Sequence, residues 1–154
     1  MEEEIPKGFA KVALAAITNS SRTIFYLQQK DETYPLEDSR LSYTFFGGHV
    51  SPGESVDDTF GREMFEELED DVAKLIIARG KKVLVYSCEL PFKREFHLFE
   101  SQFSGSELEA LAKQKVKEGK GGFLIKREEL AKTKVMPAIR MLMENYLSQY
   151  DNNL

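Results

Sequence analysis

One acidic segment, residues 54–70, constrains the fold and the chemistry of this chain more than any other. Apolar residues recur in it at every fourth position, namely Val56, Phe60, Met64 and Leu68. This spacing predicts an amphipathic helix over residues 56–70, with one face buried against a core. Ser55 can cap the first turn, and Asp57 and Asp58 suit the positive end of the helix dipole.

The carboxylates of this helix share one face beside the buried one. They are Glu63, Glu66, Glu67 and Asp70. Spacings of three and four residues bring side chains together on a helix. Their mutual repulsion is relieved by a divalent cation, and hard oxygen ligands select Mg²⁺ or Mn²⁺, often together with substrate phosphates. The spacing also fits a plain solvated helix face, so both interpretations stay open at this point.

A longer motif surrounds these acids. Its residues are Gly48, Glu54, Arg62, Glu63, Met64, Glu66 and Glu67, in the order and spacing G-x5-E-x7-R-E-U-x-E-E-x-G-U, where U is aliphatic. The chain thereby resembles the Nudix hydrolase family, and Phe46-Gly47-Gly48 and Pro52-Gly53-Glu54 are similar to common Nudix sequences as well. The motif departs at its end, where Glu69 replaces the glycine and Asp70 the aliphatic residue. A helix without that glycine cap can end differently, so its last turn stays open.

The resemblance implies a fold and an activity. The fold is α+β, a Nudix-type α/β/α sandwich with a mixed sheet, and a chain without an internal repeat or linker makes residues 1–154 one domain. The implied activity is hydrolysis, by metal-activated water, of a phosphoanhydride bond in a nucleoside diphosphate linked to another moiety. That moiety could complete a nucleotide sugar, a dinucleoside polyphosphate, ADP-ribose or a nucleoside triphosphate. A nucleotide-sensing Nudix-fold module without turnover is the alternative.

The resemblance also assigns roles to single residues. The metal, Mg²⁺ or Mn²⁺, would be held by the carbonyl of Gly47 and by the carboxylates of Glu63, Glu66 and Glu67. Glu63 and Glu67 are therefore candidate catalytic residues, and Glu63 could also handle the attacking water. Arg62 and Glu54 complete the catalytic set, because the guanidinium fork can hold Glu54 through two hydrogen bonds. A surface ion pair of Arg62 with Asp58 or Glu66 is the plainer alternative.

Three residues near these motifs are candidate substrate contacts, namely Lys30, His49 and Phe46. His49 could contact a phosphate, and a solvated loop histidine fits the sequence as well. Several Nudix subfamilies carry a further acid before a late strand, for which Glu118 is the nearest candidate here. Tyr86 and Pro91 are only loosely placed for two substrate-specific markers, so the substrate stays undecided.

The remaining elements follow from local patterns. We expect strands over residues 11–18, 23–28, 43–46, 72–77, 82–89, 95–103 and 123–126, with turns at residues 19–22 and 91–94. Helices are expected over residues 107–118 and from Pro137 onward. The polar segment 29–42 is expected to be a loop that can line a ligand site.

Bulk composition excludes several classes of protein. The formal charge of -5 without a dense block of Lys and Arg argues against long nucleic acid as a partner. No apolar run approaches the roughly 18 residues of a membrane span, and the acidic N-terminus is unlike a signal peptide, so we expect a cytoplasmic protein. Cys88 is the only cysteine, which excludes an internal disulfide and a thiol cage for a metal. A small-molecule nucleotide is the expected partner, and a homodimer is possible by resemblance to the family.

Overall fold

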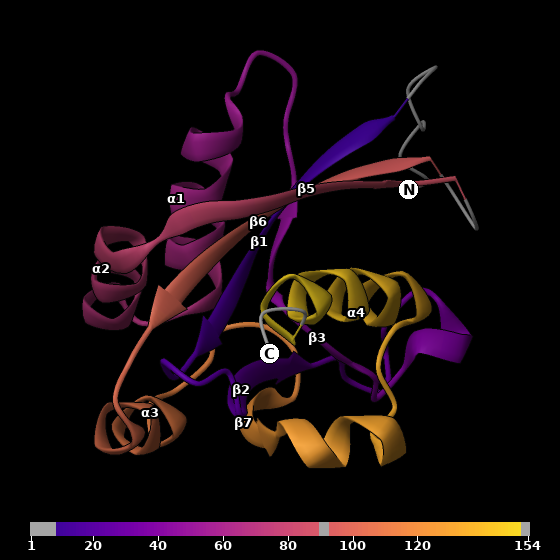
Figure 1. Ribbon diagram of the computed structural model, residues 1–154. Helices are drawn as coiled ribbons and strands as arrows, with labels where there is room; N and C mark the ends of the chain where they lie inside the picture. The colour runs from indigo at the N-terminus through magenta and orange to yellow at the C-terminus, as the bar shows by residue number, and fades with distance from the viewer. Residues whose placement is uncertain (1–8, 90–92, 152–154) are drawn as a thin grey trace.

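Strand β1 (Ala10–Thr18) runs through the middle of the molecule (Figure 1). The computed structural model describes residues 9–89 and 93–151, and the acidic start of the chain lies outside them. Residues 12–18 of β1 are buried, as expected for a strand that is covered on both faces. β1 pairs in parallel with β6 (Arg94–Gln102) and antiparallel with both β4 (Phe46–His49) and the start of β2 (Ile24–Gln29).

The sheet is mixed, as expected. Its seven strands follow the order β3-β2-β1-β6-β5, with β4 added beside β1 and β7 beside β2. The other strands are β3 (Tyr43–Thr44), β5 (Lys81–Cys88) and β7 (Gly121–Lys126). The expected aromatic strand over residues 43–46 is thus divided between β3, which pairs with β2, and β4, which pairs with β1. This division places Gly47 and Gly48 directly beside the central strand.

Helices cover both faces of the sheet. They are α1 (Val56–Glu67), α2 (Asp70–Arg79), α3 (Gly105–Ala112) and α4 (Pro137–Asp151), with short 3-10 helices η1 (Glu37–Ser39) and η2 (Arg127–Lys132). In Figure 1, α1 and α2 lie on one side of β1, β5 and β6, and α4 lies on the other. Two separate apolar cores match this arrangement, since Ile139 and Leu142 of α4 belong to one and Phe60 and Met64 of α1 to the other. The expected α/β/α sandwich is therefore confirmed. Within the described ranges, no helix has the length and apolar character needed to cross a membrane.

The expected strand over residues 72–77 is wrong, because this segment lies inside α2. Its β-branched residues suit either state, and short apolar runs do not separate a strand from a helix. In the folded chain Val72, Ala73 and Ile76 are buried while Leu75 is exposed, which is a helical pattern. Asp70 and Asp71 open the helix, where acidic side chains are favourable.

Two expected helices end early. α1 stops at Glu67 rather than at residue 70, because Leu68 is extended, fully buried and bridged to Val116. α3 stops at Ala112 rather than at residue 118, and the chain beyond it folds back against the end of α1. There the Lys117 amide donates to the Glu67 carbonyl over 2.7 Å. Asp70 therefore does not share the helix of the other acids.

The two expected hairpins are present. Residues 19–22 turn β1 into β2, with the Arg22 amide donating to the Asn19 carbonyl over 3.1 Å. β5 and β6 pair antiparallel, and β6 begins at Arg94. Pro91 and Phe92 of their expected turn fall outside the described residues.

Candidate active site

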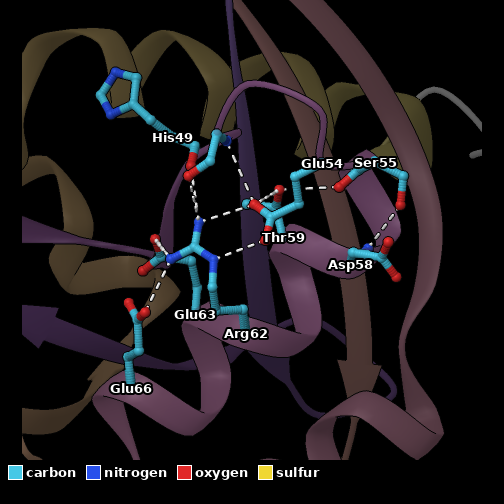
Figure 2. A network of polar contacts seen from close by, with 9 residues as sticks. His49, Glu54, Ser55, Asp58, Thr59, Arg62, Glu63 and Glu66 are labelled. Atoms are coloured by element: carbon cyan, nitrogen blue, oxygen red, sulfur yellow. Dashed lines mark hydrogen bonds and ion pairs between the residues drawn. The ribbon is translucent and has the colours of Figure 1, made fainter.

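Arg62 of α1 is the centre of a polar network that ties the preceding loop to the helix (Figure 2). Its Nε donates to Glu54 Oε2 over 2.8 Å, and its Nη2 donates to Glu54 Oε1 over 3.0 Å. The expected two-bonded pairing of Arg62 with Glu54 is therefore present. The Thr59 hydroxyl also donates to Glu54, over 2.5 Å. The hydrogen bonds from Arg62 and Thr59 lower the pKa of Glu54 to about 2.

The same guanidinium reaches two of the predicted metal ligands. Arg62 Nη1 donates to Glu63 Oε1 over 3.1 Å and to Glu66 Oε1 over 3.0 Å. Glu66 is the more exposed of the two acids, with 46% of its side chain accessible against 12% for Glu63. Glu66 is thus held by Arg62 at the surface, so the alternative pairing of these two residues coexists with the Glu54 pairing.

Glu67 is the most deeply buried acid of the site, at 2% exposure. Its Oε1 accepts the amide of Gly47 over 3.0 Å, while its buried Oε2 has no hydrogen-bond partner among the described residues. Burial raises the pKa of Glu67 well above its usual value, and the charge of Glu63 adds to the rise while Lys30 opposes it. Burial also raises the pKa of Glu63. Arg62 beside Glu63 and Lys30 near Glu67 thus only partly offset the burial of these two carboxylates.

Gly48 lets the strand and the helix approach each other. A Cβ at Gly48 would lie 2.4 Å from Oε1 of Glu63, well inside van der Waals contact. Any larger residue would displace this carboxylate, so the glycine of the motif leaves room for an acid rather than for a ligand. The Glu63 carboxylate therefore lies directly against the backbone of Gly48.

The acids suit a metal ion in part. Across residues 9–89 and 93–151, no three His, Cys, Asp or Glu side chains gather closely enough to hold one. Mg²⁺, however, is usually bound by one or two carboxylates together with waters and substrate phosphates. Glu63 and Glu67 offer that set, since the orphaned Oε2 of Glu67 is an oxygen that a cation would satisfy. Glu66 would have to leave Arg62 to join them.

A cleft of about 610 Å³ opens on the other face of the sheet, next to Gly47 and Gly48. Its apolar floor is formed by Val12, Leu14, Phe45, Phe96 and Ile139. Lys30 and His49, two of the predicted substrate contacts, both line it. In Figure 2 the imidazole of His49 points away from Arg62. The backbone carbonyl of His49 accepts a hydrogen bond from Arg62 Nη2 over 3.2 Å. The cleft and the acidic site therefore meet at residues 47–49.

Phe46 does not line the cleft, which corrects its expected role as a substrate contact. Its ring is fully buried among the α1-side core residues, stacked on Tyr26 with ring centroids 5.2 Å apart. Successive residues of a strand point to opposite faces, so Phe45 rather than Phe46 faces the cleft. An aromatic pair in a sequence does not reveal which member faces a ligand.

Several residues that line the cleft were not predicted as site residues, and two of them bear on substrate binding. Tyr34 and Arg94 line the cleft from the loop after β2 and from the start of β6. Burial raises the pKa of Tyr34, and the charge of Arg94 opposes this rise, so the two side chains are near each other. Lys30 Nζ lies 5.1 Å from the centroid of the Tyr34 ring. The only sequence signal for Tyr34 was its place in a polar loop expected to line a site.

Glu118 lies near the acidic site. The largest contributions to the raised pKa of Glu67 are burial and the charge of Glu63, and the charge of Glu118 adds to them. The backbone of Glu118 is held by the side chain of Gln28, whose Nε2 donates to the Glu118 carbonyl over 3.2 Å. Gln28 is fully buried in β2, and nothing in the sequence indicates that its side chain contacts Glu118.

The motif, the fold and the site agree with a comparison to protein families. The model for the NUDIX domain matches residues 8–146. This chain belongs to the NUDIX family. No curated protein sequence matches it significantly. In this NUDIX domain the departing residue Glu69 stands at the N-cap of α2, which explains how the motif can lack its glycine.

Solved structures with the same fold include known NUDIX proteins. A MutT protein from Methanosarcina mazei Go1 is 18% identical, with a TM-score of 0.67 and 97% of each chain covered. A MutT NUDIX hydrolase from Burkholderia pseudomallei is 18% identical, with a TM-score of 0.61, covering 90% of this chain and 98% of that one. A bifunctional NMN adenylyltransferase/ADP ribose pyrophosphatase from Francisella tularensis, complexed with AMP and a manganese ion, is 13% identical with a TM-score of 0.70. In that case 95% of this chain matches 43% of the larger protein.

Proposed function

We propose that this chain hydrolyses a phosphoanhydride bond in a nucleoside diphosphate linked to another moiety, with Mg²⁺ or Mn²⁺ as cofactor. The observation that carries the proposal is Glu67, a buried carboxylate with one unpartnered oxygen beside Glu63. The site borders a cleft of about 610 Å³, a size that suits a small-molecule ligand. Membership of a family of hydrolases supports the same reaction class.

The cation would be held by Glu63 and Glu67, with Glu66 as a third ligand once it leaves Arg62. When bound, it would neutralise phosphate oxygens and lower the pKa of a coordinated water. Among the protein groups, Glu63 would accept a proton from the attacking water. Arg62 has a positioning role, because its bonds to Glu54 and Glu63 fix the loop against the helix.

The substrate would lie along the cleft. Lys30 and Arg94 supply positive charge for phosphate oxygens, and His49 can add a hydrogen bond. The apolar floor, with the ring of Tyr34 at its side, suits a nucleoside better than a chain of sugar hydroxyls, which would be left without hydrogen bonds. Glu118 is the candidate for a further acid, since its charge acts on Glu67.

A substrate panel tests this proposal. Nucleotide sugars, dinucleoside polyphosphates, ADP-ribose and nucleoside triphosphates would be incubated with the chain and Mg²⁺ or Mn²⁺, and the products separated. We expect one class to be cleaved at a phosphoanhydride bond, with oxygen from labelled water in one product. Glu118→Gln, measured on that substrate, would lower kcat by about 10²- to 10⁴-fold if Glu118 contributes a proton transfer. Absence of turnover on every class would overturn the proposal.

A nucleotide-binding module without turnover is a second candidate function. The observation that favours it is the capture of Glu66 by Arg62, which leaves no group of three acids among the described residues. Calorimetry with the same panel separates the two. Saturable binding in the presence of Mg²⁺ without any product would favour the module.

A further inference from the structure

Gln28 joins two parts of the site that lie on different elements. It is the next-to-last residue of β2 and is only 1% exposed. Its side-chain oxygen accepts from Lys30 Nζ over 3.1 Å, and its side-chain nitrogen donates to the Glu118 carbonyl over 3.2 Å. A buried amide is costly unless it is hydrogen-bonded, and both ends of this one are used.

The loop that carries Glu118 is fitted closely to β2. The Lys120 amide donates to the Gln29 carbonyl over 2.8 Å. Gly119 has a φ of +75°, and a Cβ there would lie 2.6 Å from the Gln29 carbonyl oxygen and 3.4 Å from Cγ of Gln28. Only glycine adopts this backbone and allows this approach without strain. The position of Glu118 therefore depends on the end of β2.

The other partner of Gln28 belongs to the cleft. Lys30 lines the cleft beside the ring of Tyr34, and its positive charge also acts on Glu67. An ammonium group on a flexible stem has many rotamers, so an acceptor at a fixed distance restricts where it points. Gln28 supplies that acceptor from the core of the sheet.

We propose that Gln28 is a positioning residue that fixes the Glu118 loop and the Lys30 ammonium relative to each other across the active site. The inference rests on the proposed function in naming both partners as parts of that site. It does not follow from the motif, because Gln28 lies twenty residues before Gly48.

Two substitutions separate the two bonds. Gln28→Glu keeps an oxygen for Lys30 and adds a negative charge beside that ammonium, but it places a second oxygen against the Glu118 carbonyl, so the loop contact is lost. Gln28→Met has similar length and loses both contacts. Gly119→Ala displaces the same loop while it leaves the Gln28 to Lys30 bond intact. Gln29→Met is the matched control, since it removes a single side-chain bond of 3.0 Å from the neighbouring residue to the Leu41 carbonyl.

Steady-state kinetics on the cleaved substrate gives the first readout. Gln28→Glu and Gly119→Ala should lower kcat by about 10- to 100-fold with little change in KM, as for a misplaced catalytic group. Gln28→Met should lower kcat as much and also raise KM about tenfold, because Lys30 loses its acceptor. Gln29→Met should match the wild-type chain in both constants.

Amide hydrogen exchange without metal or substrate gives the second readout. Exchange of the Lys120 amide should accelerate about tenfold in Gln28→Glu and Gln28→Met and stay unchanged in Gln29→Met. Wild-type kinetics in the Gln28 variants, or unchanged exchange at Lys120, would overturn the positioning role. If the wild-type chain cleaves nothing but the Lys120 amide still accelerates, the proposed function fails while the contact of Gln28 with the loop stands. If Gln28→Met does not fold, the inference is tested with Gly119→Ala instead. A kcat of Gly119→Ala equal to that of the wild type would then overturn the inference.

Discussion

The guanidinium of Arg62 donates hydrogen bonds of 2.8 and 3.0 Å to the two carboxylate oxygens of Glu54, which lies eight residues earlier. This contact closes the loop before α1 onto the second turn of the helix. Arg62 simultaneously contacts Glu63 and Glu66, so one side chain sets the loop and restrains two acids. The loop and the acidic face therefore behave as one unit, and a change at Arg62 should affect both stability and activity.

Replacing Arg62 tests this coupling. Arg62→Gln should lower the free energy of unfolding by about 1 to 2 kcal/mol, because Glu54 loses a charged, two-bonded partner. Turnover should fall with it as the loop loosens. Arg62→Lys keeps the charge but loses the planar guanidinium. Its free energy of unfolding and its kcat/KM should therefore lie between those of the wild type and Arg62→Gln, as measured by urea unfolding and steady-state kinetics. Unchanged stability in Arg62→Gln would show that the network contributes no measurable stability.

Glu67→Gln separates a metal ligand from a structural acid. The change preserves size and helix propensity and removes one charge, so Mg²⁺ binding and turnover should fall together. The loss of a transition-state interaction of about 3 to 4 kcal/mol corresponds to roughly 10² to 10³-fold in rate. Stability without metal should hold or rise slightly as repulsion from Glu63 is relieved. Exposed Glu109 on α3 is the matched site, and Glu109→Gln should change none of these quantities.

Normal turnover and normal metal dependence in Glu67→Gln would contradict the assignment. The acidic face of α1 would then be an ordinary solvated surface. Calorimetric titration with Mg²⁺ and Mn²⁺, run beside the kinetic assay, distinguishes lost binding from lost chemistry.

Gly48→Ala should act on the neighbouring acid. The added methyl group would meet the Glu63 carboxylate at 2.4 Å, and the far end of that side chain can move aside. We therefore expect a folded chain whose apparent affinity for Mg²⁺ in the assay falls by about tenfold, with a smaller effect on the melting temperature. Equal metal dependence in Gly48→Ala and wild type would mean that Glu63 need not occupy this place.

Acid stability should depend on Glu107, far from the active site. Hydrogen bonds from Arg79, then from the Ser104 amide, lower the pKa of Glu107 from 4.5 to about 2. A group with a depressed folded-state pKa contributes stability above its unfolded value and loses it as the pH falls through the folded value. The Tm difference between wild type and Glu107→Gln should thus be full above pH 4.5 and shrink toward pH 2. Because the Arg79–Glu107 pair is exposed, high salt should also reduce this Tm difference. A Tm difference that stays constant between pH 4.5 and pH 2 would contradict the pairing.

Local patterns determined the parts of the fold that local energetics controls. The start of α1 follows from the Ser55 cap, whose hydroxyl accepts the Asp58 amide over 3.0 Å, and from the spacing of Phe60 and Met64. The resemblance to the NUDIX family implied the pairing of Arg62 with Glu54, and both residues lie within one short segment. Such features depend on neighbours in the chain, so they can be inferred before any tertiary structure is known.

Contacts between distant segments decided the rest. α1 ends at Glu67 because Leu68 is buried and bridged to Val116. The sequence around the helix does not predict that contact. Phe45 and Phe46 differ only in which face of the sheet they meet, which the pairing of β4 with β1 sets. The place of Gln28 in the site follows only from its bond to Glu118, ninety residues away in the chain. A sequence determines local preference and hydrophobic spacing, whereas the burial of a particular side chain depends on partners that only the folded chain brings together.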